Sequence, residues 1–298
     1  MPLAVVALDF DPVVRYGDNA VRLETLALAG AILVALFVAG AIATRTRAER
    51  PGAVDGRDRL RLDDLILLVL AVVPGAVAGG RLGYALLHLD FYAAHPMAIL
   101  DPAQGSLELS LAVVGGALTG TYAARLIDES VEQWLDLAAV PLLAAIALGK
   151  LAMALGGSGQ GGPSDAAWAT SYVGDRAWAS LAPAIPSHPS QVYEAIATAI
   201  VLAALIGWLW RRPLSRPGTA FFVGLAGWAA VRALVAVTWR DAPVLGPLLA
   251  EQLLCLAIIV GCVLATVPLP RPKPRFALRW PRRTAPRAEP DAEARPPI

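Results

Sequence analysis

The sequence has little charge, little cysteine and little histidine. Asp, Glu, Lys and Arg make up 16% of its 298 residues and hydrophobic residues make up 57%, whereas soluble domains carry about 25% charged and 45–50% apolar residues. These proportions argue against a soluble domain. Two cysteines and three histidines exclude a disulfide framework and a cysteine-based zinc site, and the sequence points to no metal or cofactor. A net charge of +1 excludes a general basic field for nucleic acid.

Long apolar runs are what the sequence has in abundance. Seven of them approach or exceed the length of about 20 residues with which a helix crosses the hydrocarbon core of a bilayer. The first run starts too late, and lacks the basic leading segment, to be a removable signal peptide. We therefore predict an all-α, polytopic membrane protein with seven transmembrane helices. They are expected at Leu26–Ala43, Leu65–Leu87, Leu107–Ala124, Leu135–Leu155, Gln191–Trp210, Thr219–Val237 and Leu245–Val267.

Basic residues alternate between the connections. Those after the first, third and fifth runs, and the C-terminal tail, carry six, one, three and eight Lys or Arg residues. The segment before the first run and the connections after the second, fourth and sixth carry two, none, one and one. Because cytoplasmic loops collect Lys and Arg, we expect the N-terminus outside and the C-terminus in the cytoplasm.

Two regions differ in composition. Residues 1–267 hold all seven runs and form the predicted seven-helix membrane domain. Residues 268–298 contain nine prolines and a mixture of charges, a composition that cannot form a packed core. We predict that this segment is a disordered, Pro- and Arg-rich cytoplasmic tail.

Ionisable residues in the predicted spans lie at one depth. Arg81, Lys150 and Arg232 each lie five or six residues from the outer end of a span, and Glu194 and Glu251 lie near the outer ends of two others. Charges inside a bilayer cost about 2.5–3.5 kcal/mol, so such residues are functional candidates. We predict one polar cavity near the outer surface, where three cations hold the phosphate of a phospholipid headgroup. The alternative is ordinary pairing between helices, such as Glu194 with Arg232.

The segment His188-Pro-Ser-Gln-Val-Tyr-Glu194 carries the most specific pattern. By itself it predicts an outside loop that enters a helix, with Ser190 as the cap and Glu194 in the first turn. It closely resembles the HPSQLYE signature of the prolipoprotein diacylglyceryl transferases, from which only Val192 differs. Further segments resemble that family in the same order: Phe10-Asp11-Pro12, Gly80-Arg81-Leu82-Gly83-Tyr84, Gly115-Gly116, Gly149-Lys150 through Gly161, Arg232 with Arg240, and Gln252.

The resemblance implies an activity in the bacterial inner (plasma) membrane. Family members move a diacylglyceryl group from phosphatidylglycerol to the lipobox cysteine of a prolipoprotein signal peptide, and glycerol phosphate leaves. Basic residues would stabilise the departing phosphate, and the thiol must lose its proton to attack. We therefore expect His188, Glu194, Arg232 and Lys150 to be catalytic. The residues expected to bind the lipid phosphate and headgroup are Arg81, Tyr84, Lys150, Gln191, Tyr193, Arg232, Arg240, Gly115, Gly116 and Gly161.

The sequence departs from the family pattern where the family has polar residues. The positions are Val114 for a His, Lys150 for an Arg, Met153 and Gly156 for Asn, Ser158 and Ala236 for acids, Glu24 for an aromatic residue, and Trp228 for a Tyr. Lys150 keeps the charge of the Arg but not its two-pronged fork. Two hypotheses follow: an active, divergent transferase, or a non-catalytic paralogue that binds anionic phospholipid or lipoprotein on the same scaffold.

Overall fold

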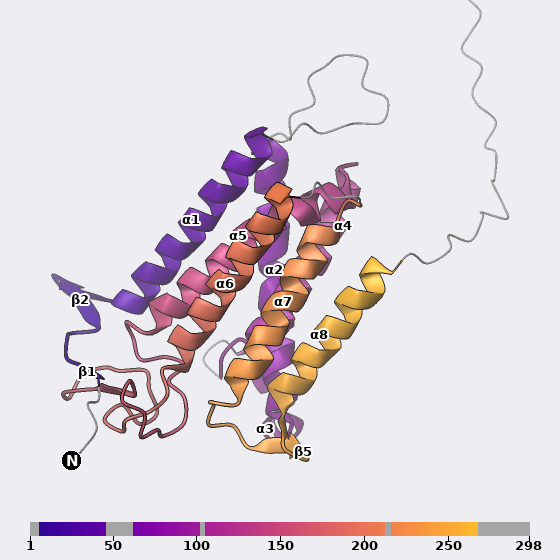
Figure 1. Ribbon diagram of the computed structural model, residues 1–298. Coiled ribbons are helices and arrows are strands. Elements are labelled where there is room, and N and C mark those ends of the chain that lie inside the picture. Colours follow the sequence, from indigo (N-terminus) through magenta and orange to yellow (C-terminus); the bar gives the residue numbers. More distant parts are fainter. Residues whose placement is uncertain (1–5, 46–61, 102–104, 212–215, 268–298) are drawn as a thin grey trace, which may run out of the picture. The chain divides into compact units, whose positions relative to one another are not determined.

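The computed structural model describes residues 6–45, 62–101, 105–211 and 216–267, and the predicted tail 268–298 lies outside them. Six long apolar helices and one shorter one dominate these residues, which confirms the prediction of an all-α polytopic membrane protein. Which end of the bundle faces outward stays a prediction. The helices are α1 (Leu23–Arg45), α2 (Leu62–Leu87), α4 (Leu109–Leu126), α5 (Val131–Met153), α6 (Ser190–Arg211), α7 (Thr219–Ala236) and α8 (Ala250–Thr266) (Figure 1).

The largest error in the predicted boundaries is at the start of the last helix. We expected it from Leu245, but α8 begins at Ala250. The preceding residues form a small antiparallel pair, β5 (Pro243–Leu245) and β6 (Leu248–Leu249). Gly246 turns the chain between these strands with a φ of +58°, a conformation that glycine adopts without steric cost, and a proline follows it. The apolar run therefore begins as a hairpin of strands, and hydrophobicity alone does not distinguish a short strand from the first turns of a helix.

Two apolar clusters hold the bundle together. The larger joins α5, α6, α7 and α8 around Leu143, Leu205 and Trp228, and the smaller joins α1, α2, α4 and α5 around Leu137. Helix α5 contributes to both clusters and so links the two groups of helices. Large apolar side chains such as Phe37, 78% exposed, cover the outer surface, as expected for helices that face lipid.

Small residues set the closest helix contacts. Along α1, an alanine is buried at every fourth position from Ala31 to Ala43, and this narrow face lets α1 lie close to α5. Glycines do the same between α2 and α4. A Cβ on Gly115 would lie 2.2 Å from the carbonyl oxygen of Gly75, and a Cβ on Gly79 would lie 2.2 Å from that of Leu111. Helices α2 and α4 therefore meet backbone to backbone.

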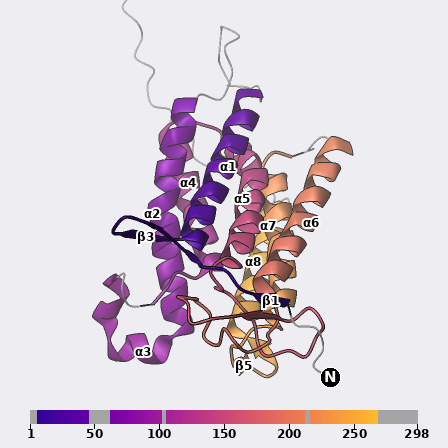
Figure 2. The same ribbon diagram turned by 90° about the vertical axis from the view of Figure 1, so that its left-hand side faces the viewer.

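Most of the short elements gather at one end of the bundle, the end at which α4, α6 and α8 begin, whereas the strands that lead into α1 lie nearer its middle (Figures 1 and 2). We call this the site end; it is the lower end in Figure 1. The hairpin of β2 (Val13–Tyr16) and β3 (Asn19–Arg22) leads into α1, and β1 (Val6–Leu8) pairs in parallel with β4 (Thr170–Tyr172). After α2 come the short helix α3 (Leu89–Ala94) and the 3₁₀ helix η1 (Pro96–Leu100).

Candidate functional site

A buried ion network occupies the site end, between helices that are far apart in the sequence. Glu194, the fifth residue of α6, accepts a hydrogen bond from Arg232 Nη1 of α7 at 2.7 Å. Its other oxygen lies 2.9 Å from Lys150 Nζ at the end of α5. All three side chains are buried. Both oxygens of Glu194 are thus engaged by cations, which fixes the two cations relative to each other.

Arg232 is also held from its opposite side. Its Nε donates to Glu251 Oε1 of α8 at 2.7 Å and to Ser110 Oγ of α4 at 3.1 Å. Ser110 Oγ in turn donates to Glu251 Oε1 at 2.5 Å. Glu108, which caps the start of α4, lies 3.6 Å from Arg232 Nη2. Arg232 therefore bridges α4, α6, α7 and α8 through one planar guanidinium group.

Two tryptophans complete the surroundings of Arg232. The guanidinium carbon lies 5.5 Å from the ring centre of Trp228 and 4.9 Å from that of Trp239. Aromatic faces attract a cation at these distances, most strongly where water is excluded. The Trp that replaces a tyrosine of the resembled family at position 228 thus keeps a ring beside this arginine.

The charge balance of the network differs from the prediction. We expected three cations and two acids. The network instead has two cations, Lys150 and Arg232, and three acids, Glu194, Glu251 and Glu108. Leaving one member of a buried ion pair without its partner costs about 3–5 kcal/mol. The carboxylates therefore make it possible to bury two cations here, and an anionic ligand must reach them from the side that the carboxylates leave open.

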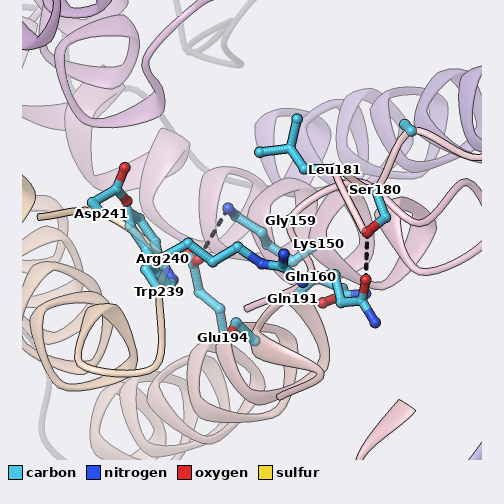
Figure 3. A pocket seen from close by; sticks show the side chains of 12 residues that line it. Lys150, Gly159, Gln160, Ser180, Leu181, Gln191, Glu194, Trp239, Arg240 and Asp241 are labelled. Carbon is cyan, nitrogen blue, oxygen red and sulfur yellow. Dashed lines mark hydrogen bonds and ion pairs between the residues drawn. The ribbon is translucent and has the colours of Figure 1, made fainter. Parts of the chain in front are cut away.

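That open side is a cavity of about 290 Å³ beside Lys150 and Glu194 (Figure 3). Arg240 lies in its wall, with Nε donating to Gly161 O at 2.6 Å and Nη2 donating to Ser187 Oγ at 3.0 Å. Lys150 has three N–H donors, so donors remain beyond the one directed at Glu194. The cavity wall thus carries two cations and two carboxylates, Glu194 and Asp241, of which Glu194 is engaged by Lys150 and Arg232. Its lining residues are Lys150, Gly159, Gln160, Ala179, Ser180, Leu181, Ser190, Gln191, Glu194, Trp239, Arg240 and Asp241.

Gln191 forms part of the cavity wall and is only 2% exposed. Its Nε2 donates to the hydroxyl oxygen of Tyr172 at 3.0 Å, and Tyr172 donates to Ala154 O at 3.0 Å. Burial raises the pKa of the Tyr172 hydroxyl to about 12, so this hydroxyl stays protonated and keeps both bonds. Gln191 Oε1 is buried without a hydrogen-bond partner among the described residues. Because buried polar atoms are normally paired, this oxygen marks a place where a donor of a ligand or water would be stabilised.

Comparison with known proteins gives this arrangement a family. The family model described as prolipoprotein diacylglyceryl transferase matches residues 13–267. The chain belongs to this family. Curated relatives named phosphatidylglycerol–prolipoprotein diacylglyceryl transferase include one from Ruegeria pomeroyi, 31% identical over 223 residues that cover 73% of this chain and 74% of that protein. Another, from Trichormus variabilis, is 29% identical over 261 residues that cover 86% of this chain and 88% of that protein.

Membership in the prolipoprotein diacylglyceryl transferase family and the apolar helices together make this chain a multi-pass bacterial membrane protein. The heptad that carried the resemblance, which ends in the start of α6, divides into residues that line the cavity and residues that do not. Gln191 and Glu194, three residues apart, line the cavity, whereas Tyr193 contacts Trp168 and His188 contacts Tyr193. Trp168 Nε1 donates to the Tyr193 hydroxyl at 2.6 Å, and His188 Nδ1 lies 3.5 Å from the same oxygen. His188 and Tyr193 are therefore not among the residues that line the cavity.

Ser190 contributes to the site in a way that the sequence did not suggest. We expected its hydroxyl to cap α6, but the hydroxyl pairs with Thr238 Oγ1 at 2.6 Å. The contact joins the start of α6 to the end of α7. Gly161 packs into the same junction, where an added Cβ would lie 2.2 Å from Ser190 Oγ and 2.4 Å from Thr238 O. Gly161 therefore acts here through its lack of a side chain.

Arg81 does not join the other two cations. Its guanidinium donates to the carbonyl oxygens of Ile99 at 2.7 Å, Ala98 at 2.8 Å and Asp101 at 2.5 Å. Arg81 therefore fixes the η1 segment that follows α2. Tyr84, which was expected to bind the lipid headgroup together with Arg81, stacks on the ring of His88 at a centroid distance of 4.2 Å. Neither side chain lines the cavity of 290 Å³.

Gly115 and Gly116 also lie away from the cavity. Where the family has a His-Gly-Gly turn, this chain has an unbroken helix, because α4 runs from Leu109 to Leu126. Gly115 meets Gly75 in the contact between α2 and α4. The residue in place of the family histidine, Val114, packs against the larger apolar cluster. This region of α4 therefore contributes packing rather than polar groups.

Sequence reasoning missed several members of the network. Glu108 and Ser110 lie within the first residues of the predicted third span, at the same depth as the other polar residues, so the depth argument could have included them. Trp239, next to Arg240, could have been found as an aromatic neighbour of the late arginines. Gln160 and Ser180 carried no comparable signal, because a long irregular loop brings them together: Ser180 Oγ donates to Gln160 Oε1 (Figure 3).

Proposed function

We propose that this chain transfers a diacylglyceryl group from phosphatidylglycerol to the thiol of a lipobox cysteine in a prolipoprotein signal peptide, and so releases glycerol phosphate. One observation carries the proposal: Lys150, Gln191, Glu194 and Arg240, which come from three family segments of the sequence, line a single cavity. The names of the relatives from Ruegeria pomeroyi and Trichormus variabilis agree with it. We further propose that the site end faces outward, because the basic loops lie at the opposite ends of the helices.

The size of the cavity sets how the lipid would bind. Its volume of about 290 Å³ is at the lower limit of small-molecule pockets, which span about 300–1,000 Å³. A phosphoglycerol headgroup fits such a volume, but two acyl chains do not. The acyl chains would therefore remain among the membrane lipids, against the apolar outer faces of the helices.

The reaction requires stabilisation of a leaving phosphate. The thiolate sulfur attacks the glycerol carbon, a sulfur–carbon bond forms, and the carbon–oxygen bond breaks with its electron pair retained by the phosphate oxygen. Lys150 and Arg240, fixed in the cavity wall, would stabilise the charge that develops on that oxygen. Arg232 and Glu194 would hold Lys150 in place from behind.

The thiol must give up its proton before or during the attack. Two of the residues expected to be catalytic, His188 and Glu194, could accept this proton, but Glu194 has both oxygens engaged by cations. His188 has one ring nitrogen close to Tyr193, and its other ring nitrogen can accept a proton in the corresponding tautomer. We therefore propose His188, two residues before the cavity-lining Ser190, as the acceptor.

A transfer assay tests this function directly. Purified protein in phosphatidylglycerol vesicles would be mixed with a lipobox peptide, and labelled lipid on the peptide would be measured. Arg232→Ala should abolish transfer and Arg240→Ala should lower it, whereas Arg176→Ala, at an exposed ion pair with Asp9, should leave it unchanged. Wild-type protein that transfers no lipid, and that does not restore a strain lacking its own transferase, would remove the proposal.

The non-catalytic alternative has one specific observation in its favour. Val114 replaces a histidine and is packed among apolar side chains, so this part of the chain supplies no proton acceptor. A lipid-binding paralogue would bind phosphatidylglycerol with the same dependence on Lys150 and Arg240. It would not modify the peptide, so the two functions separate in the same assay.

A further inference from the structure

Glu24, at the start of α1, reaches the glycine-rich loop that forms part of the cavity wall. Ser158 Oγ donates to Glu24 Oε2 at 2.7 Å. The side chain of Glu24 is 12% exposed, and the nearest cation, Arg22, lies 3.8 Å from the same oxygen. Glu24 is thus a mostly buried carboxylate whose short contact is with a neutral hydroxyl group of the loop.

The backbone of the loop is shaped around this carboxylate. A Cβ on Gly156 would lie 1.9 Å from Glu24 Oε2, so any larger residue at this position would collide with it. Gly157 and Gly159 have φ angles of +84° and +73°, which few other residues adopt. A loop with so little intrinsic restriction depends on its anchors to keep one conformation.

The anchors lie on both sides of the two loop residues that line the cavity. On one side, Glu24 holds Ser158, and Arg22 Nη2 donates to Gly156 O at 3.4 Å. On the other, Gly161 N donates to the backbone of His188, and Gly162 N donates to that of Thr238. Gly159 and Gln160 lie between these anchors and in the cavity wall. Gln160 itself also bonds to Thr170 O at 2.8 Å and to Ser180 Oγ, so the contact between Glu24 and Ser158 is the anchor that holds the N-terminal side of this wall.

The two residues are also two of the departures from the family pattern. The pattern has an acid at the position of Ser158 and an aromatic residue at the position of Glu24. In the folded chain these positions touch, and the carboxylate approaches the contact from α1 instead of from the loop. Because Gly156 has no side chain, the carboxylate of Glu24 can occupy the space beside it.

We propose that Glu24 is a positioning residue for the cavity wall and that its carboxylate, through Ser158, anchors the glycine-rich loop to α1. This inference rests on the proposed function. It predicts that the two residues can be exchanged, because a hydroxyl group and a carboxylate would then meet at the same place with their partners reversed.

The experiment compares Glu24→Ser, Ser158→Glu and the exchange variant that carries both substitutions. Displacing a wall of the site by about 1 Å costs on the order of 100-fold, so Glu24→Ser should lower kcat/KM for transfer at least tenfold. Ser158→Glu should lower it as well, because two carboxylates would meet. The exchange variant should recover to within about threefold of the wild type. Asp9→Asn, at an exposed loop ion pair, is the control and should not change the rate.

The outcomes separate the two proposals. A carboxylate needed only for the stability of α1 would not be replaced by one on the loop, so an exchange variant no better than the worse single variant would overturn the inference. Unchanged activity of Glu24→Ser would overturn it too. If the wild type transfers no lipid, the proposed function fails, and the affinity of the same variants for phosphatidylglycerol vesicles decides the inference by the same pattern of loss and recovery.

Discussion

Removing the charge of Glu194 tests whether the ion network works as a unit. In Glu194→Gln, Arg232 keeps Glu251 at 2.7 Å. Lys150, which is 9% exposed, loses the one carboxylate found within 4.0 Å of its Nζ in the described part of the chain. An uncompensated buried charge costs about 3–5 kcal/mol. Each kcal/mol lowers Tm by about 2–4 °C in a protein of this size, so we expect a decrease of about 6–20 °C.

Adding Lys150→Met to this variant should reverse part of the loss. The double variant no longer buries an unpaired cation, so it should melt at a higher temperature than Glu194→Gln alone. Lys150→Met by itself should have a smaller effect, because Glu194 keeps Arg232 at 2.7 Å. Melting in detergent micelles, followed by the fluorescence of the eight tryptophans, measures all three variants. If the losses of the two single variants simply add in the double variant, the two side chains do not depend on each other and the reasoning is wrong.

Three further predictions concern packing, capping and titration. Gly115→Ala should weaken the fold and lower Tm, because its Cβ would lie 2.2 Å from the Gly75 carbonyl oxygen, whereas Gly30→Ala, with nothing within 4 Å, should not. Asp136→Ala should cost about 0.5–2 kcal/mol, since its carboxylate accepts hydrogen bonds from two backbone N–H groups at the start of α7; Asp136→Asn, which keeps an acceptor oxygen, should lose less Tm. The pKa of Tyr172 is raised to about 12, so in an absorbance titration this residue should not ionise with the tyrosines that titrate near pH 10. The stability that its buried hydroxyl contributes should fall as pH rises from about 10 to 12. A difference spectrum between the wild type and Tyr172→Phe that changes near pH 10 would contradict this.

The number of helices and the depth of the polar residues could be predicted from the sequence. Both follow from properties that add up along the chain: a helix rises about 1.5 Å per residue, and apolar runs must match the membrane. This is why Lys150, Glu194, Arg232 and Glu251 were expected at one level, where the structure brings them together. The hairpin before α8 could not be separated from the helix, because a strand and a helix can use the same short apolar run.

We did not predict from the sequence how each helix is rotated about its own axis. The segment His188–Glu194, which leads into α6, demonstrates this. Residues three or four apart share a helical face, so Gln191 and Glu194 point together into the cavity and Tyr193 points to Trp168. The spacing could have separated them, but a match to a family signature treats all seven positions alike. The helical spacing of these residues would have predicted which of them line the cavity and which do not.

The place of Arg81 follows from the same cause. The glycine contact with α4 fixes the rotation of α2, and it turns Gly80 and Gly83 toward Glu108: a Cβ on Gly83 would lie 2.7 Å from Glu108 Oε2. Arg81 projects from another side of the helix, since successive residues are rotated by about 100°, and it meets the carbonyl groups of η1 instead. Glu108 therefore enters the network where a cation was expected. The sign of the charge at this position therefore depends on which side of α2 carries the small residues, because the glycines of a close helix contact decide which side chains of α2 can reach the network.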